Sequence, residues 1–336
     1  MRQWNIARLG LKSMGQWAVG ASIAALMAGA AWANSGNVYV SSEKDNKLFV
    51  FNGKGDRLAE IPTCERPRHM MFSLDRKQIF VCCGNSNELG VVDVASNKMV
   101  RTMALGDSPE IFDFNADQSV IYVSIEDENV MAAYDMKSGA RLFHIATAGE
   151  PEGIYVMPNG KIAYVTSEVG NVVHVMDLQN RKVLKDLKVG KRPRRFTPSA
   201  DGKEVWVSNE LSNSISVIDT ATHTVKDTIV FKVQGMRDTD VQPVGMVLSK
   251  DGKTMWVGLG PSQRAAQVDM ASRKVLQLVQ VGKRAWNVGM SPDGKTLFVV
   301  NGLSDDMTVV DVSGAQARAV RTVAAGRVPH SALVMP

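Results

Sequence analysis

Three cysteines are the first candidates for chemistry, because two of them are adjacent. Residues 79–85 read IFVCCGN, which places Cys82 beside Cys83, and the third cysteine is Cys64. The odd count leaves at least one thiol unpaired within the chain. Adjacent cysteines can close a strained disulfide ring, act as a redox or metal-binding pair, or fill small positions at a strand end. The sequence leaves these alternatives open and makes Cys82 and Cys83 the redox candidates.

Charged side chains recur in short Gly-x-x-Pro segments. Two of these segments are acidic and carry Glu110 and Glu152, whereas most of the others are basic. Because guanidinium groups match carboxylates and phosphates, we predict a small anionic ligand, such as a polycarboxylate or a quinone carboxylate, with Trp286 as a stacking wall. The alternative is a solvated rim whose arginines pair with the glutamates. The predicted ligand-binding residues are Arg68, Arg194, Arg195, Arg237, Trp286, Asn287 and His330.

Two histidines, His69 and His330, lie in the same recurrent segments. Together with Glu110 or Glu152 they are the candidates for general acid–base catalysis in a hydrolase or lyase. The same residue types can bind a metal ion, but no close ligand spacing supports this, and no metal site is predicted.

Several cofactor and catalytic motifs are missing from the chain. It contains no C-x-x-C-H, so no covalently bound haem is expected. It contains no G-x-S-x-G motif and no P-loop. Trp206, Trp256 and Trp286 do not recur at a fixed period, so the sequence does not support binding of pyrroloquinoline quinone (PQQ).

An internal repeat supplies the elements that position these residues. Turn segments such as SADGK (199–203) and SPDGK (291–295) centre on residues 75, 117, 159, 201, 251 and 293, in steps of 42 with one step of 50. Asp-Gly between alternating apolar runs predicts two-residue hairpins. A repeat of 40–45 residues with about four short strands is typical of a β-propeller blade. We therefore predict an all-β, seven-bladed propeller with four antiparallel strands per blade.

The two ends of the chain are expected to share one blade. The segment RVPHSALVMP (327–336) supplies one strand of that blade, and residues 37–61 supply the other three. Residues 1–33 have a basic start, an apolar run and the small-residue site AWA, which is typical of a Sec signal peptide. The predicted domains are thus the signal peptide, 1–33, and one propeller, 34–336, whose split blade comprises 34–63 and 326–336.

The repeats resemble a known family. IYVSIEDENVMAAYD (121–135) and SVIDTATHTVKDTI (216–229) are similar to YVTN-type propeller repeats, over essentially the whole mature chain. FKVQGMRDTDVQPVG (231–245) and KRPR (191–194) resemble a narrower group, the propellers associated with PQQ-dependent catabolism. This resemblance implies a shared pathway with PQQ-linked oxidation and does not imply that this chain binds PQQ.

The repeat also places the candidate residues. The Gly-x-x-Pro segments lie on one rim of the central channel, as a basic arc facing a short acidic arc. The extra residues in 231–242, which include Arg237, form a longer loop on that rim. The hairpin register sets Cys82 opposite His69 and Cys83 opposite Arg68, neighbours that lower a thiol pKa. Cys64 reaches Cys83 only if its loop folds back.

We expect an exported, periplasmic, non-enzymatic binding module linked to PQQ-dependent alcohol or aldehyde oxidation. Its expected partners are a small anion and a periplasmic dehydrogenase or cytochrome. The alternative is a lactonase-like hydrolase or a lyase acting in the channel mouth. Removing residues 1–33 takes away Arg2, Arg8 and Lys12 and lowers the formal net charge from +5 to +2. That charge predicts no nucleic acid partner, and no membrane association is expected after cleavage.

Overall fold

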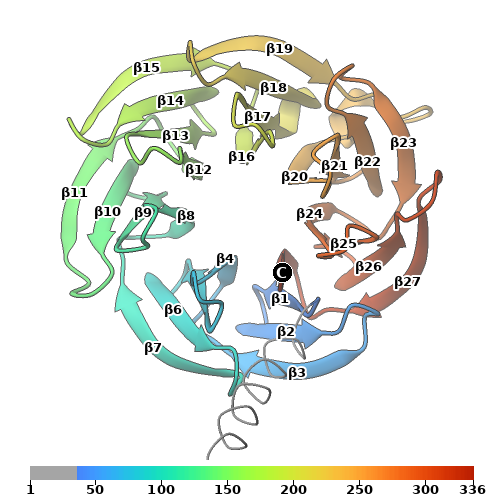
Figure 1. Cartoon of the computed structure of the whole chain (residues 1–336), viewed down its shortest axis with the longest axis horizontal. Helices are drawn as coiled ribbons and strands as arrows, with labels where there is room; N and C mark the ends of the chain where they lie inside the picture. Colours follow the sequence, from blue (N-terminus) through green and yellow to red (C-terminus); the bar gives the residue numbers. More distant parts are fainter. Residues whose placement is uncertain (1–35) are drawn as a thin grey trace, which may run out of the picture. The chain divides into compact units, whose positions relative to one another are not determined.

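The computed structural model describes residues 36–336, which fold into seven four-stranded antiparallel sheets arranged as blades around one axis (Figure 1). The predicted seven-bladed propeller is confirmed. The predicted signal peptide lies outside the described residues. Among residues 36–336, no helix has the length and apolar character needed to span a membrane.

Blades are numbered by their innermost strands in chain order. Blade 1 contains β28 (Pro329–Val334), β1 (Val38–Ser42), β2 (Lys47–Phe51) and β3 (Arg57–Pro62). Blade 2 contains β4 (Pro67–Phe72), β5 (Gln78–Cys83), β6 (Glu88–Asp93) and β7 (Lys98–Ala104). Blade 3 contains β8 (Pro109–Phe114), β9 (Val120–Ile125), β10 (Val130–Asp135) and β11 (Arg141–Ala146). Blade 4 contains β12 (Pro151–Val156), β13 (Ile162–Ser167), β14 (Val172–Asp177) and β15 (Lys182–Lys188).

The remaining three blades follow the same plan. Blade 5 contains β16 (Pro193–Pro198), β17 (Glu204–Asn209), β18 (Ser214–Asp219) and β19 (Thr224–Val230). Blade 6 contains β20 (Pro243–Leu248), β21 (Thr254–Leu259), β22 (Arg264–Asp269) and β23 (Val275–Gln280). Blade 7 contains β24 (Ala285–Met290), β25 (Thr296–Asn301), β26 (Asp306–Asp311) and β27 (Arg318–Ala324). Two short 3-10 helices, η1 (Glu210–Ser212) and η2 (Asp238–Asp240), lie in loops.

Both ends of the described chain close the ring in blade 1. Strand β28 pairs with β1 in antiparallel register, with Val40 opposite Ala332 and Val38 opposite Val334. Buried apolar side chains from neighbouring blades pack between the sheets and form a separate cluster at each of several interfaces. Closure removes open sheet edges at the ring seam, as expected for a propeller.

The hairpin turns differ from the prediction. In SADGK, the connection from β16 to β17 spans residues 199–203, and only Gly202 has a positive φ, of 67°. The Gly202 N–H donates to the Ser199 carbonyl, and the Ser199 hydroxyl donates to the Asp201 carboxylate at 2.7 Å. The aspartate recurs because it stabilises this longer turn, not because it occupies a two-residue hairpin.

Each innermost strand carries an irregularity that brings two adjacent residues to the axis. In blade 2, Pro67 pairs with Cys83 and Met70 pairs with Val81, so Arg68 and His69 both lie opposite Cys82. The same shift follows Pro193 in blade 5. Two residues facing one define a β-bulge, and the bulge is why consecutive residues rather than alternate ones reach the channel.

Small hydroxyl residues near the end of the second strand hold these bulges together. The Ser124 hydroxyl accepts from the Ile111 N–H of its own blade and donates to the Glu152 carbonyl of the next. Thr166 and Ser41 make equivalent bridges to the carbonyls of Arg194 and Arg68. The Arg195 N–H likewise donates to the Ser208 hydroxyl at 3.2 Å. The backbone that carries the axial side chains is therefore cross-linked from blade to blade.

Candidate functional site

The axial end of the bulges holds a buried network of opposite charges. Its guanidinium and carboxylate groups belong to Arg66, Arg68, Arg192, Arg194, Arg195, Glu43, Glu110, Glu152, Glu168 and Glu210. The predicted separation into a basic arc facing an acidic arc is wrong, because arginines and glutamates alternate in contact. The alternative interpretation predicted that the arginines pair with the glutamates, and they do. It also predicted a solvated rim, whereas most of these groups are buried.

Glu152 lies between two arginines in the middle of the network. Its carboxylate oxygens lie 3.2 Å from Arg194 Nη1 and 3.2 Å from Arg195 Nη2. Burial alone raises the pKa of Glu152, but the two guanidinium groups outweigh burial and lower it to about 2. Glu152 is therefore ionised at neutral pH and serves as a counter-charge, not as a general acid.

Two further carboxylates of the network, Glu168 and Glu210, were missed by the sequence analysis. Arg194 contacts Glu168 and lies 2.7 Å from Glu210 through Nε, so three carboxylates surround it. Burial and the nearby Glu152 charge raise the pKa of Glu168 to about 8, although Arg194 and Arg192 oppose the shift. A signal was present in the repeat, because Glu126, Glu168 and Glu210 follow their strands at 42-residue steps.

The other end of the network joins blades 1, 2 and 3. Arg68 contacts Glu110 and lies 2.8 Å from Glu43 through Nε, and Arg66 lies 3.3 Å from Glu110. His330 Nε2 accepts from Arg195 Nη2 at 3.1 Å, and its Nδ1–H donates to the Ser331 hydroxyl. Burial, followed by the charges of Arg68 and Arg195, lowers the pKa of His330 well below its ordinary value. This histidine is therefore a neutral hydrogen-bonding link.

A cavity of about 140 Å³ lies on the axis directly beside the network. It is lined by the second residue of several bulges and by the apolar residues that follow them. The lining residues are His69, Ile111, Gly153, Ile154, Arg195, Phe196, Gly245, Met246 and Asn287. We call it the axial cavity. Gly153 and Gly245 pack so closely against the neighbouring strands that a Cβ at either position would lie within 2.1–2.5 Å of backbone atoms.

Arg195 is the charged group of the axial cavity. Its side chain is buried, and neither Nε nor Nη1 has a hydrogen-bond partner in residues 36–336. Arg195 shares Glu152 with Arg194, which has Glu168 and Glu210 as further partners. The charge of Arg195 is therefore less well balanced than that of Arg194. Burial lowers the pKa of Arg195 to about 10, with Arg68 and Arg194 adding to the shift and Glu152 opposing it. A buried cation with two free donor nitrogens favours an anionic or strongly polarised ligand.

His69 also lines the axial cavity. Burial and the charge of Arg195 lower its pKa to about 3, so the imidazole is neutral at physiological pH. Its ring packs edge-on against Phe112 with centroids 4.9 Å apart. The structure thus brings His69 and Arg195 into one cavity, while Glu110, the other predicted acid–base group, is held by Arg66 and Arg68.

Other predicted ligand-binding residues lie elsewhere or are already engaged. The Trp286 ring does not form a free stacking wall, because the guanidinium carbons of Arg284 and Arg194 lie 3.9 and 5.2 Å from its centroid. Asn287 lines the axial cavity and donates to Ser331. Arg237 is exposed in the long loop and pairs with Asp240 at 2.9 Å. A quinone carboxylate is larger than the axial cavity alone, because drug-sized ligands occupy about 300–1,000 Å³.

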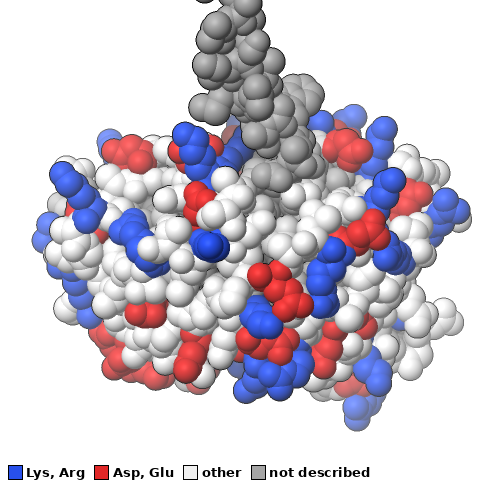
Figure 2. Space-filling view, turned by 90° about the horizontal axis from the view of Figure 1, so that it is seen from below, with Lys and Arg blue, Asp and Glu red and all other residues white. Residues whose placement is uncertain are grey.

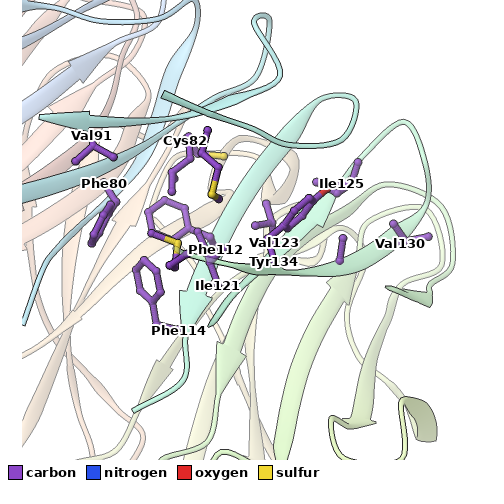
Figure 3. Close-up of a cluster of buried hydrophobic side chains, with 14 residues drawn as sticks. Phe80, Cys82, Val91, Phe112, Phe114, Ile121, Val123, Ile125, Val130 and Tyr134 are labelled. Atoms are coloured by element: carbon purple, nitrogen blue, oxygen red, sulfur yellow. The ribbon is translucent and has the colours of Figure 1, made fainter. Parts of the chain in front are cut away.

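The adjacent cysteines do not act together. Cys83 forms a disulfide with Cys64, whose loop folds back to reach it, and Cys82 is a free, buried thiol. Successive side chains of a strand point to opposite faces, so Cys82 instead packs with Phe80, Val91 and Phe112 between blades 2 and 3 (Figure 3). Burial raises the pKa of Cys82 to about 12, despite the nearby Arg68. The predicted register of Cys83 is also off by one residue, since it faces Pro67.

Outside the axis, the molecule shows no comparable charge organisation on the side seen in Figure 2. Lys and Arg side chains are interspersed there with Asp and Glu. Within residues 36–336, no group of three or more His, Cys, Asp or Glu side chains is arranged to hold a metal ion. The axial charge network and the axial cavity are therefore the features that define the candidate site.

Fold and site together define a seven-bladed β-propeller with a buried charge network and a small cavity on its axis. The sequence profile of the YNCE-like β-propellers matches residues 104–290, more than half of the chain. The chain belongs to this YNCE-like β-propeller family. A comparison with curated protein sequences gives no match.

Solved structures with the same fold come from proteins of low sequence identity. The periplasmic gluconolactonase of Pseudomonas aeruginosa is 18% identical, with a TM-score of 0.75 over 90% of this chain and 99% of that chain. A Bacteroides fragilis protein provisionally assigned as a 6-phosphogluconolactonase is 16% identical, with a TM-score of 0.75 over 89% and 98%. The hydrazine synthase of Kuenenia stuttgartiensis is 18% identical, with a TM-score of 0.72 over 83% and 93%. At these identities the similarity concerns the fold.

Proposed function

We propose that the protein binds a small organic carboxylate in the axial cavity, with Arg195 as its charge partner. The observation that carries this proposal is the pair of unpartnered nitrogens, Nε and Nη1, on a buried guanidinium group. The Nε–H and Nη1–H bonds of a guanidinium group point in different directions, so one of them donates to the carboxylate and the other donates to a second acceptor or a water. The low local dielectric strengthens both hydrogen bonds. Neutral His69 and the amide of Asn287 supply further polar contacts on the cavity wall.

The cavity limits the size of the ligand. Its volume of about 140 Å³ corresponds to roughly four or five waters, at about 30 Å³ each in the liquid. Ile154, Phe196 and Met246 make the wall beyond the polar groups apolar. The ligand class is therefore an acid of a few carbon atoms, whose carboxylate faces Arg195 and whose remainder contacts apolar side chains.

Isothermal titration calorimetry with acetate, lactate, glycerate and succinate tests this proposal. We expect the best ligand of this series to lose at least 30-fold in affinity in Arg195→Met, because the charge-assisted hydrogen bonds are gone. Arg141→Met is the matched control, since Arg141 pairs with Glu128 on the exposed outer surface. Equal affinity in the wild type and Arg195→Met, with both proteins folded, would contradict the proposal.

A second function is proposed for the same cavity: hydrolysis of a small lactone. The neutral imidazole of His69 beside Arg195 favours it, and the related folds include a gluconolactonase. Water attacks the lactone carbonyl carbon while hydrogen-bonded to His69, and the developing oxyanion faces Arg195. The ring C–O bond then breaks, the leaving oxygen takes one proton of the attacking water, the other proton passes to solvent, and a hydroxy-carboxylate results. With its pKa near 3, His69 is a weak base, so Arg195 supplies most of the stabilisation.

Turnover of γ-butyrolactone, a lactone of four carbon atoms, separates the two functions. A lactonase loses at least 100-fold in kcat/KM in Arg195→Met and less in His69→Gln, because removing one oxyanion donor costs about 10²–10³-fold. A pure binding protein shows the same background hydrolysis for the wild type and both variants, while the wild type still binds 4-hydroxybutyrate in the calorimeter.

We also propose that the protein is exported to the periplasm and serves PQQ-linked oxidation there. The leader pattern of residues 1–33 and the Cys64–Cys83 disulfide support an oxidising compartment. The resemblance stated above makes a periplasmic dehydrogenase or cytochrome the partner to test by co-purification from the periplasmic fraction. Mass spectrometry that finds a periplasmic protein with Asn34 as its first residue would support the proposal. Retention of the full-length chain in the cytoplasm would contradict it.

A further inference from the structure

Two loops that begin with the same three residues, Gly-Lys-Arg, lead into blades 5 and 7. Residues 190–195 read GKRPRR and residues 282–287 read GKRAWN. Arg192 and Arg284 occupy the same place, directly before the first residue of β16 and of β24. Both have the left-handed backbone conformation, with φ of 56° and 60°. The backbone therefore presents the two guanidinium groups from equivalent positions.

Arg192 contacts two carboxyl groups that come from equivalent places in adjacent blades. Its Nε lies 2.7 Å from Glu168 and 3.3 Å from Glu210. Glu168 directly follows β13 in blade 4, and Glu210 directly follows β17 in blade 5. The corresponding residues next to Arg284 are those that directly follow β21 and β25, and these are Gly260 and Gly302.

Arg284 consequently has no carboxylate at ion-pair distance from these two positions. It makes no ion pair with a carboxylate of residues 36–336, and its guanidinium carbon lies 3.9 Å from the centre of the Trp286 ring. Trp286 is only 5% exposed, yet its indole N–H has no partner among the described residues. An unpaired, partly buried cation beside an unpaired buried donor is unfavourable unless an anion or water completes the site.

A cavity of about 40 Å³ lies between these groups. Arg284, Trp286, Arg68 and His330 line it, together with Glu43. The Glu43 carboxylate is held at 2.8 Å by Arg68, so its charge is offset within the protein. Since a cavity needs roughly 10–15 Å³ to hold one water-sized particle, this one holds a single small ion and at most a water beside it.

We propose that this cavity, between Arg284 and Trp286, binds a small inorganic anion of the halide class. The anion takes the place of the two glutamates that are absent after β21 and β25. The guanidinium group of Arg284 supplies the charge and the indole N–H of Trp286 supplies a hydrogen bond. This site is separate from the axial cavity, because the linings of the two cavities share no residue. It therefore stands independently of the carboxylate proposed for Arg195.

Bromide is the probe for the first test. We titrate sodium bromide at constant ionic strength, balanced with sodium sulfate, whose anion is too large for the cavity, and follow the unfolding temperature. The wild type should gain several degrees as the site fills, because a ligand that binds only the folded protein stabilises it. Arg284→Met should lose this gain, and Arg195→Met should keep it. An equal bromide response in the wild type and in Arg284→Met would overturn the proposal.

A gain-of-carboxylate variant gives a sharper test. Gly302 has no left-handed φ, and a Cβ placed there meets its nearest atoms at 3.6 and 3.9 Å, so a side chain fits. Gly302→Glu restores the carboxylate that Glu210 supplies in blade 5 and should weaken bromide binding at least tenfold. Gly302→Ala, which adds a methyl group and no charge, should keep it. A crystal grown in bromide should show anomalous scattering beside Trp286 in the wild type and none in Gly302→Glu. Water alone in the wild-type cavity would contradict the assignment.

Discussion

The loops that lead into blades 5 and 7 have the same backbone conformation at the arginine, but only the blade 5 arginine is paired with carboxyl groups. In blade 5, Arg192 is paired with Glu168 and Glu210, so its charge is satisfied by the protein itself. For the blade 7 loop, glycine stands at both carboxylate positions, one in blade 6 and one in blade 7, and Arg284 lies on the Trp286 ring instead. The loop backbone is thus a property of the repeat, whereas the two residues that follow the second strands of adjacent blades decide whether its arginine is paired within the protein.

Blade 2 holds the corresponding loop in a third way. Its second strand is followed by Gly84, and the loop that carries Arg66 is tied to the end of β5 by the Cys64–Cys83 disulfide. Gly90 leaves room for this bond, because a Cβ there would lie 3.1 Å from the Cys64 sulfur. In blade 2 a covalent link therefore adds to the ion pair between Arg66 and Glu110. We expect these three arrangements to contribute different amounts to the free energy of unfolding.

The largest loss is expected from the centre of the blade 5 network. Glu152→Gln removes the carboxylate shared by Arg194 and Arg195 and leaves Arg195 without a counter-charge. Breaking a buried pair from one side costs about 3–5 kcal/mol, and urea unfolding should show a loss of that size. Glu128→Gln, at the exposed pair with Arg141, is the control and should cost less than about 1 kcal/mol. Equal losses in the two variants would mean that the network contributes no more than surface pairs.

Reduction of the blade 2 disulfide is expected to have the next largest effect. Cys64 and Cys83 are 19 residues apart, and closing a loop of about this size contributes about 3 kcal/mol. Dithiothreitol should therefore lower the midpoint of urea unfolding of the wild type. The Cys64→Ala/Cys83→Ala double variant should not respond to reductant, and Cys82→Ala should still respond, because its disulfide is intact. If dithiothreitol also lowered the unfolding midpoint of the double variant, the loss of stability would not come from this disulfide.

The pH dependence of stability should also distinguish blade 5 from blade 7. Because the folded pKa of Glu168, about 8, lies above its ordinary value of 4.5, folding favours the protonated carboxyl. This contribution is complete below pH 4.5 and is lost as the pH rises to about 8. Glu168→Gln should therefore remove the decline in unfolding free energy across that window. The measurement is the difference in unfolding free energy between variant and wild type at each pH, and a constant difference would contradict the shift.

The smallest effects come from the two equivalent arginines. Arg192→Met leaves Glu168 and Glu210 with one cation fewer and should cost about 1 kcal/mol, since Arg192 is partly exposed. Arg284→Met removes an unpaired charge together with its contact to Trp286, so in halide-free buffer it should change stability by less than about 0.5 kcal/mol. Urea unfolding of both variants in sulfate buffer checks the comparison. Similar losses would show that Arg284 has a counter-charge within the protein.

Much of the fold could be predicted because its signals are local and repeated. The 42-residue step, the turn aspartates and the proline positions each reappear in most blades, so an error in one unit is corrected by the others. The two-residue hairpins failed as a prediction because Asp-Gly alone does not distinguish them from the longer turn seen at residues 199–203. The glutamates after the second strands were predictable in principle from the same periodicity.

The repeated sequence pattern is sufficient to predict a ring of seven similar units with charged residues at one end of the innermost strands. Which of these charges meet depends on how the chain folds. Arg195 contacts His330, 135 residues away, and Cys83 reaches Cys64 only because the intervening loop folds back. Such partners come from different blades or loops and depend on bulges and side-chain direction. No period in the chain encodes them, which is why the two free nitrogens of Arg195 and the isolation of Cys82 became apparent only in the folded protein.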